Sequence, residues 1–440
     1  MNFFNKQKQK QNIKSIAFLF TGLAFIACTF DDESDPNRPS LEGVLSEATV
    51  NQLNNLVVGV EATMRAGKAG QTTGSGTMAR ELYLFDADPR NTGDLLGANG
   101  AVLDNNSFYS SSPWRSRYLA IKNANILLEA INNTDAITSR QKAGYSGFAK
   151  TIIAHELIDV VKSFGKARVD VLDPSNLGAI LNENEAFSAV DSILDEAASD
   201  LSIAGGSFAF PLAGFDGFDS PSDFLKFNKA LKAKVALYSG DMAKCLSALS
   251  ESFLNLNGDL SIGPKHVFSL GSGDQTNGLY KIIDNNGDQI IVHDSFINDA
   301  EAGDLRVNNK TVIRSNPTGQ DDLSGSHQTA LYVTNVSSID IIRNEELVLI
   351  YAEAKIFSDP SEAENAINII RASSGLASYN GLPSTSALTK ELLRQRRYSL
   401  WCENHRMYDL RRYNLSSTLP IDRPGDQVFN QFPVPLTENE

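Results

Sequence analysis

The chain has 440 residues, a formal net charge of −14, 3 cysteines and 15 prolines. At this length it can bury a substantial core, in one large domain or in several smaller ones. The composition excludes collagen-like, low-complexity and disulfide-scaffold proteins. The acidic balance argues against nucleic acid as a partner, because binding phosphates requires a basic surface.

The first 27 residues have the layout of a secretory signal peptide. Lysines are frequent at the start, no acidic residue precedes Asp31, and a short apolar run extends from Ile16 to Ala27. This run is too short to cross a bilayer as a helix, which takes about 20 residues. We therefore predict that residues 1–27 are a signal peptide.

Cys28 follows directly after this apolar run and is preceded by Ala27. The arrangement resembles the lipobox of bacterial lipoproteins, in which the cysteine is acylated and the chain is cut before it. We predict that Cys28 is lipidated and that residues 28–40, which are acidic and poor in helix formers, are a solvated tether. In lipoproteins of Bacteroidetes, a similar acidic cluster accompanies export to the cell surface. The alternative is an ordinary cleaved signal or an uncleaved anchor with an incidental cysteine.

Residues 41–440 are predicted to form one mostly α-helical domain. Apolar residues recur at helical spacing in several segments, and turn residues separate the segments in pairs. One helix–turn–helix spans residues 223–256, the period of tetratricopeptide repeats. The other predicted pairs are 46–65 with 114–131, 146–165 with 183–202, and 339–357 with 361–373. We therefore expect tetratricopeptide-like helix pairs without a strict sequence repeat.

Long irregular loops are predicted between these helices, and loops of such length are commonly functional. They cover residues 66–113, 203–222, 257–338 and 374–385. Within the third, Asn286-Gly287 lies between two apolar runs, which predicts a small β-hairpin over residues 279–292.

No motif of a catalytic or metal site is complete. His155-Glu156 lacks the second histidine of a zinc site and is interpreted as a structural pair. The run from Asp284 to Asp288 departs from the EF-hand register, so a turn is favoured, although another calcium geometry stays open. Paired carboxylates of a glycoside hydrolase also stay open, because they need not be close in sequence. We predict no enzyme activity, no cofactor and no bound metal.

Residues 394–412 contain six arginines among packing residues. In an acidic chain these arginines are expected to pair with neighbouring carboxylates rather than to bind nucleic acid. Cys245 and Cys402 each fall within a helical pattern, which favours buried free thiols over a disulfide.

The same segment resembles the C-terminal signature of the SusD/RagB family, surface nutrient-binding lipoproteins of Bacteroidetes. The matching positions are Arg396, Arg397, Leu400, Glu403, Arg406, Asp409, Leu410, Arg411 and Arg412. Asn404 stands where the family has Gly, at an expected helix break that Asn tolerates better than most residues. Further segments similar to the family follow one another in the same order, at 114–125, 149–165, 231–241, 343–354 and 432–435.

The resemblance implies a scaffold of tetratricopeptide-like helix pairs whose irregular segments form the ligand surface. It also implies capture of a glycan, or in some members a peptide, without catalysis. The partner it implies is a SusC-like TonB-dependent transporter of the outer membrane, with the chain held at the cell surface by its lipid anchor.

Two loop segments combine aromatic rings with polar groups, which suits sugar faces and hydroxyls. The candidate ligand-binding residues are Tyr83, Phe85, Asp86, Asp88 and Arg90 in the first segment, and Phe208, Phe210, Phe215 and Phe218 in the second. Plain loop packing is the alternative for each group. The modest aromatic content leaves peptides and other small nutrients open as ligands.

Two other functions compete with nutrient binding. A lipid-anchored surface glycoside hydrolase would lose activity on mutation of one carboxylate pair. A tetratricopeptide-type assembly adaptor of the envelope would have an exposed concave protein-binding face and no pocket for a small ligand.

Overall fold

The computed structural model describes residues 41–173 and 175–438. The predicted signal peptide, the lipidated Cys28 and the tether at 28–40 lie outside these residues. The chain divides into two compact units, Met1–Val44 and Leu45–Glu440. Over the described part of the chain, no helix is both long and apolar enough to cross a membrane.

Most of the regular structure is α-helical, as predicted. The helices are α2 Leu41–Glu47, α3 Val50–Met64, α4 Lys68–Met78, α5 Phe108–Asn132, α6 Ser139–Phe164, α7 Glu183–Ile203, α8 Pro221–Tyr238, α9 Met242–Ser250, α10 Asp294–Asn298, α11 Leu305–Lys310, α12 Asn344–Lys355, α13 Pro360–Ser373, α14 Thr385–Ser399 and α15 Arg406–Arg412. The strands are β1 Leu82–Phe85, β2 Lys166–Arg168, β3 Ile180–Asn182, β4 Lys265–His266, β5 Gln289–Val292, β6 Thr311–Gln320, β7 Leu323–Thr329 and β8 Ile339–Asp340.

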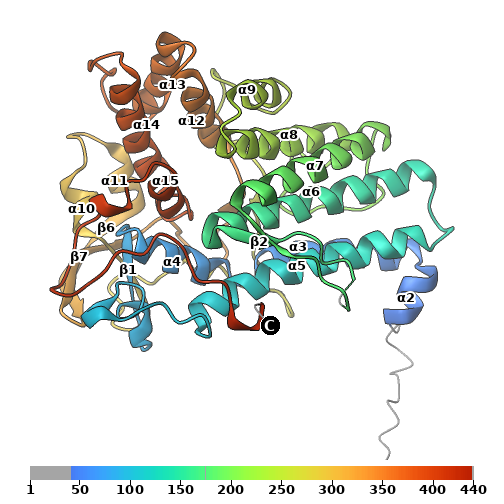
Figure 1. Ribbon diagram of the computed structural model, residues 1–440, viewed down its shortest axis with the longest axis horizontal. Coiled ribbons are helices and arrows are strands. Elements are labelled where there is room, and N and C mark those ends of the chain that lie inside the picture. The colour runs from blue at the N-terminus through green and yellow to red at the C-terminus, as the bar shows by residue number, and fades with distance from the viewer. Residues whose placement is uncertain (1–40, 174, 439–440) are drawn as a thin grey trace, which may run out of the picture. The chain divides into compact units, whose positions relative to one another are not determined.

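The helices pack as pairs along the chain. α3 packs on α5, α5 on α6, α6 on α7, α7 on α8, α8 on α9 and α12 on α13. Figure 1 shows α5 to α9 side by side in chain order, with α12 to α14 beyond them. The four predicted helix pairs are therefore confirmed, and with them the mostly α-helical fold.

Local capping defines the ends of the long helices. Thr138 and Gln141 form a capping box at the start of α6, and Gly165 ends the helix in the left-handed conformation. Asn182 and Glu185 form the same box at the start of α7. These side chains satisfy amide groups that an isolated helix leaves without partners.

The centre of the scaffold is α6, in which every residue from Thr151 to Phe164 is buried. Its polar side chains therefore need partners inside the protein. Glu156 lies 2.8 Å from Arg117 of α5, and both side chains are fully buried. His155 approaches Glu156 at 3.9 Å, which fits a structural role for the His155-Glu156 pair.

A four-stranded antiparallel sheet with the order β1-β5-β7-β6 lies outside the helix pairs. β1 pairs with β5 so that Tyr83 is opposite Ile291. β6 and β7 form a hairpin whose turn residues, Asp321 and Asp322, both have positive φ. Asp tolerates this conformation better than most residues.

The predicted location of the hairpin was wrong. Residues 279–292 do not fold back on themselves: only Gln289–Val292 forms a strand, and it pairs with β1 and β7. The Asn286-Gly287 signal marks a bend before β5, and the hairpin of this sheet is β6–β7. Two stretches predicted to be irregular are also partly regular: 66–113 contains α4 and β1, and 257–338 contains α10, α11 and the strands β4 to β7.

Cys245 and Cys402 are free and buried, as predicted. Asn404 has φ of 60°, which confirms the helix break expected at that position. It lies between α14 and α15, the two helices that carry the arginine-rich segment.

Candidate ligand-binding site

A hollow of about 680 Å³ lies at the end of the sheet and contains part of the first predicted segment. Three chain segments form it: residues 85–88 after β1, residues 286–289 before β5, and residues 318–320 of β6. We call this hollow the strand-edge pocket. Its volume lies within the range of pockets that hold small ligands.

The acidic residues of this pocket are held by short local hydrogen bonds. Both Asp86 carboxylate oxygens accept from Asn91 Nδ2 at 3.0 Å, and the Asp88 amide donates to Asp86 at 2.9 Å. The Arg90 guanidinium forks onto Asp88 at 2.9 and 2.7 Å. These hydrogen bonds lower the pKa of the Asp88 carboxyl. Asp88 is therefore ionised at neutral pH and fixed in orientation.

The aromatic residues of the first segment face the core. Tyr83 and Phe85 stack with ring centroids 5.8 Å apart, and both pack with Leu96, Ile291 and Leu323. Burial raises the pKa of Tyr83 well above its ordinary value. Phe85 borders the strand-edge pocket but is only 2% exposed, so little of its ring surface is open to a sugar face.

The second predicted segment packs mainly as an aromatic cluster. Phe208 and Phe210 stack at 4.6 Å, Phe215 lies 5.5 Å from Phe224, and Phe218 contacts a further phenylalanine. Phe210, Phe215 and Phe218 are buried. Phe215 borders a separate hollow of about 360 Å³ with residues of α3 and of the 265–274 segment.

The structure thus does not bring the two predicted groups together in one pocket. Asp86 and Asp88 offer polar groups to the strand-edge pocket, whereas the four phenylalanines support the packing of the 203–222 loop. Ligand contact by either group stays a prediction.

Sequence reasoning missed two of the three segments that form the strand-edge pocket. Asn286, Asp288 and Gln289 reach the pocket through the pairing of β5 with β1, and Thr318 and Gln320 through the β6–β7 hairpin. The signals in the sequence were the Asn286-Gly287 turn and the acidic run from Asp284 to Asp288, and neither indicates which strand lies beside them.

The chemistry of this pocket is that of binding through hydrogen bonds. Carboxylates of Asp86, Asp88 and Asp288, the amides of Asn286 and Gln320 and a threonine hydroxyl can accept from or donate to ligand hydroxyl groups. Within residues 41–173 and 175–438, no group of three or more His, Cys, Asp or Glu side chains is placed to hold a metal ion. Asp284 instead accepts from the Ser315 amide and hydroxyl at 2.9 and 2.7 Å.

The arginine-rich segment forms the predicted ion pairs. Arg396 lies 2.7 Å from Asp409, and Arg411 lies 2.9 Å from Glu183. Arg412 pairs with both Glu353 and Asp409. These contacts join α15 to α7, α12 and α14, so most of the segment is structural.

Residues 306–434 match the model of the SusD family. No curated protein sequence matches the chain.

Solved structures match nearly the whole chain. A SusD superfamily protein from Bacteroides vulgatus is 16% identical with a TM-score of 0.65, over 89% of this chain and 96% of the other. A laminarin-binding SusD-like protein is 18% identical with a TM-score of 0.63, over 89% and 97%. Surface glycan-binding protein A from Bacteroides thetaiotaomicron, in complex with laminarihexaose, is 13% identical with a TM-score of 0.67, over 89% and 97%. The predicted fold is confirmed.

Proposed function

The chain is a SusD/RagB family protein, and from this we propose that it is a nutrient-binding lipoprotein of the cell surface. In this proposal it captures a glycan and delivers it to a SusC-like TonB-dependent transporter of the outer membrane, without catalysis. The observation that carries the proposal is the fold shared with a protein solved in complex with laminarihexaose. A peptide or another small nutrient is the alternative ligand.

The proposed organisation has three parts. Residues 1–27 are the signal peptide, residues 28–40 contain the lipidated Cys28 and the acidic tether, and residues 41–440 form one SusD-like helical domain. Acylation at Cys28 with more than one chain would give stable anchoring, because a single chain binds membranes only marginally.

The proposed ligand site is the strand-edge pocket. Its supporting observations are the ordered carboxylates of Asp86 and Asp88 and the convergence of three chain segments around a hollow of about 680 Å³. Polar groups that are already fixed by hydrogen bonds lose little conformational entropy when a ligand binds.

Binding of laminarihexaose, measured by isothermal titration calorimetry, tests this function. We expect a measurable affinity and no hydrolysis products, and about a tenfold loss of affinity in the double variant Asp86→Asn, Asp88→Asn, because each loses charged hydrogen-bond acceptors. Asp135→Asn, which changes an exposed aspartate outside the pocket, is the matched control. No affinity for any member of a glycan and peptide panel would contradict the proposal, and released shorter sugars would favour the hydrolase.

The anchor has its own test. The wild-type protein should incorporate labelled fatty acid, and the Cys28→Ala variant should not. Its thermal unfolding should match that of the wild-type protein, and label in Cys28→Ala at the wild-type level would contradict lipidation of Cys28.

A further inference from the structure

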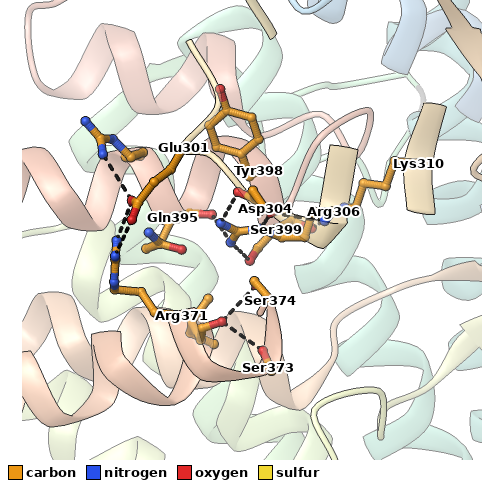
Figure 2. Close-up of polar contacts among 12 residues, drawn as sticks. Glu301, Asp304, Arg306, Lys310, Arg371, Ser373, Ser374, Gln395, Tyr398 and Ser399 are labelled. Carbon is orange, nitrogen blue, oxygen red and sulfur yellow. Dashed lines mark hydrogen bonds and ion pairs between the residues drawn. The ribbon is translucent and has the colours of Figure 1, made fainter. Parts of the chain in front are cut away.

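One face of α14 is occupied by contacts within the protein. Arg306 forks onto Asp304, with Nη2 at 2.7 Å, and donates to Ser399 Oγ at 3.0 Å. Arg371 lies 2.7 Å from Glu301 beside this network. Figure 2 shows both arginines held between their partners, on the side where α11 and α13 approach α14. These ion pairs fix the position of the helix.

The opposite face of α14 borders a pocket. The residues on this face recur every three or four positions and are Ser386, Thr389, Lys390, Leu393, Arg394 and Arg397. Together with α15 and residues 413–418 they enclose about 650 Å³. We call this hollow the α14–α15 pocket.

The pocket has an exposed mouth and a buried floor. Lys390, Arg394 and Thr418 are exposed, whereas Arg396 and Tyr398 on the floor are each 1% exposed. A ligand that enters at Lys390 therefore meets basic side chains at both depths.

The acidic residues of the pocket are already paired. Asp299 lies 2.8 Å from Arg397, and Asp409 lies 2.7 Å from Arg396. Two basic groups of the same pocket have no ion-pair partner among the described residues.

Lys390 and Arg406 are these groups. Among the residues that the structure describes, neither has a carboxylate within the 4 Å of an ion pair, and neither forms a side-chain hydrogen bond. The Arg396 Nη1 and Nη2 atoms and the Arg406 Nε atom are also buried without a hydrogen-bond acceptor. Buried donors without acceptors are rare and destabilising, so an acceptor from a ligand would be stabilising here.

The charge states of Arg406 and its neighbour Glu81 also favour a ligand with a negative charge. Burial, followed by repulsion from Arg397, lowers the pKa of Arg406 to about 10, against a weaker opposing attraction by Glu81 and Asp409. Burial raises the pKa of nearby Glu81 to about 8. At neutral pH Arg406 is therefore still charged, while Glu81 is mostly protonated and does not neutralise it.

The other groups that border the pocket indicate more than a bare ion. Ser386, Thr389 and Thr418 supply hydroxyl groups, and Leu393 and Leu415 supply apolar surface. This mixture suits a sugar ring, and the arginine fork suits a carboxylate. Taking the proposed glycan binding as its basis, we propose that the α14–α15 pocket binds the carboxylate of a uronic acid unit in an acidic glycan.

The experiment compares two trisaccharides that differ only in this group. Trigalacturonate and its neutral counterpart, reduced to the alcohol at C6, are titrated calorimetrically into the full protein at two salt concentrations. We expect trigalacturonate to bind at least about tenfold more tightly, and its affinity to fall with added salt, because the recognition is electrostatic.

Variants assign the binding to this pocket. Arg406→Gln should weaken trigalacturonate binding about tenfold, and Lys390→Gln, at an exposed position, should weaken it less. Arg115→Gln removes an exposed arginine of α5 that does not border the pocket and should have no effect. If Arg406→Gln does not fold, Lys390→Gln still tests the pocket.

Three results would overturn the inference. They are equal affinity for the acidic and the neutral trisaccharide, unchanged binding in both pocket variants, and displacement of trigalacturonate by an equal concentration of inorganic sulfate. The proposed function is judged separately by laminarihexaose and the Asp86 and Asp88 variants. Failure of the uronic acid inference therefore leaves the proposed function standing. Failure of the laminarihexaose test likewise leaves the result with trigalacturonate to be judged by itself.

Discussion

The helical scaffold and the α14–α15 pocket each contain a largely buried arginine, and the two arginines differ in their partners. In the scaffold, Arg117 faces Glu156 at 2.8 Å and donates to the Met64 carbonyl at 2.9 Å. In the pocket, Arg406 is repelled by Arg397 and has no ion-pair partner among the described residues. In the scaffold the arginine thus stabilises the fold through its partners, whereas the arginine of the pocket is available to pair with a ligand.

The largest effect on stability is expected from breaking the Arg117–Glu156 ion pair of the scaffold. Arg117→Ala removes the 2.8 Å ion-pair partner of buried Glu156 and should lower the free energy of unfolding by about 3–5 kcal/mol. Chemical denaturation measures this change. Arg115→Ala, on the exposed face of the same helix, should change it by less than about 0.5 kcal/mol. Equal effects of the two substitutions would contradict the contrast between the regions.

An intermediate effect on stability is expected from substitution of Glu81, and this effect should depend on pH in a defined direction. Burial raises its folded-state pKa from 4.5 to about 8, so the native state binds the extra proton between these values. Its contribution to stability is therefore full below about pH 4.5 and is lost as the pH rises through about 8. Glu81→Gln should remove this loss.

Thermal unfolding at pH 5, 7 and 9 measures the difference. The melting temperature of Glu81→Gln, relative to that of the wild-type protein, should increase as the pH rises. Glu129→Gln controls for the removal of one carboxyl group from an exposed position. A difference in melting temperature that does not depend on pH would contradict the claim that burial raises the pKa of Glu81.

The smallest effect on stability is expected in the pocket itself. Arg406→Met removes a charge that has no ion-pair partner among the described residues, so the free energy of unfolding should change by less than about 1 kcal/mol or increase. The same denaturation experiment measures it beside Arg117→Ala. A loss as large as that of Arg117→Ala would show that Arg406 is a structural residue.

Sequence patterns were sufficient for the paired helices, because those helices carry their own start and stop signals. The capping box at Thr138 and the glycine at 165 are local and readable. α4 could not be predicted in this way, since Gly70, Gly74 and Gly76 are poor helix formers. Tertiary packing requires the last two: a Cβ atom at Gly74 would lie 3.1 Å from the Phe432 ring, and one at Gly76 would lie 2.9 Å from the side chain of Leu82.

The site was less predictable than the fold for a related reason. Asp86 and Asp88 are visible as a polar segment, but residues 286–289 and 318–320 join them only through pairing between distant strands. Likewise, the arginines of α14 and α15 look alike in sequence. Only the structure separates Arg396, which has Asp409, from Arg406.

The carbonyl groups at the C-terminal end of α6 accept hydrogen bonds from residues that come much later in the chain. Arg411 donates to the carbonyls of Val161 and Lys162, and the Phe432 amide donates to the Ser163 carbonyl at 2.9 Å. The partners of the Arg411–Val161 bond are 250 positions apart in sequence. The central helix therefore cannot acquire its final contacts until most of the chain has been synthesised. During synthesis, its apolar surface has to be kept from premature association.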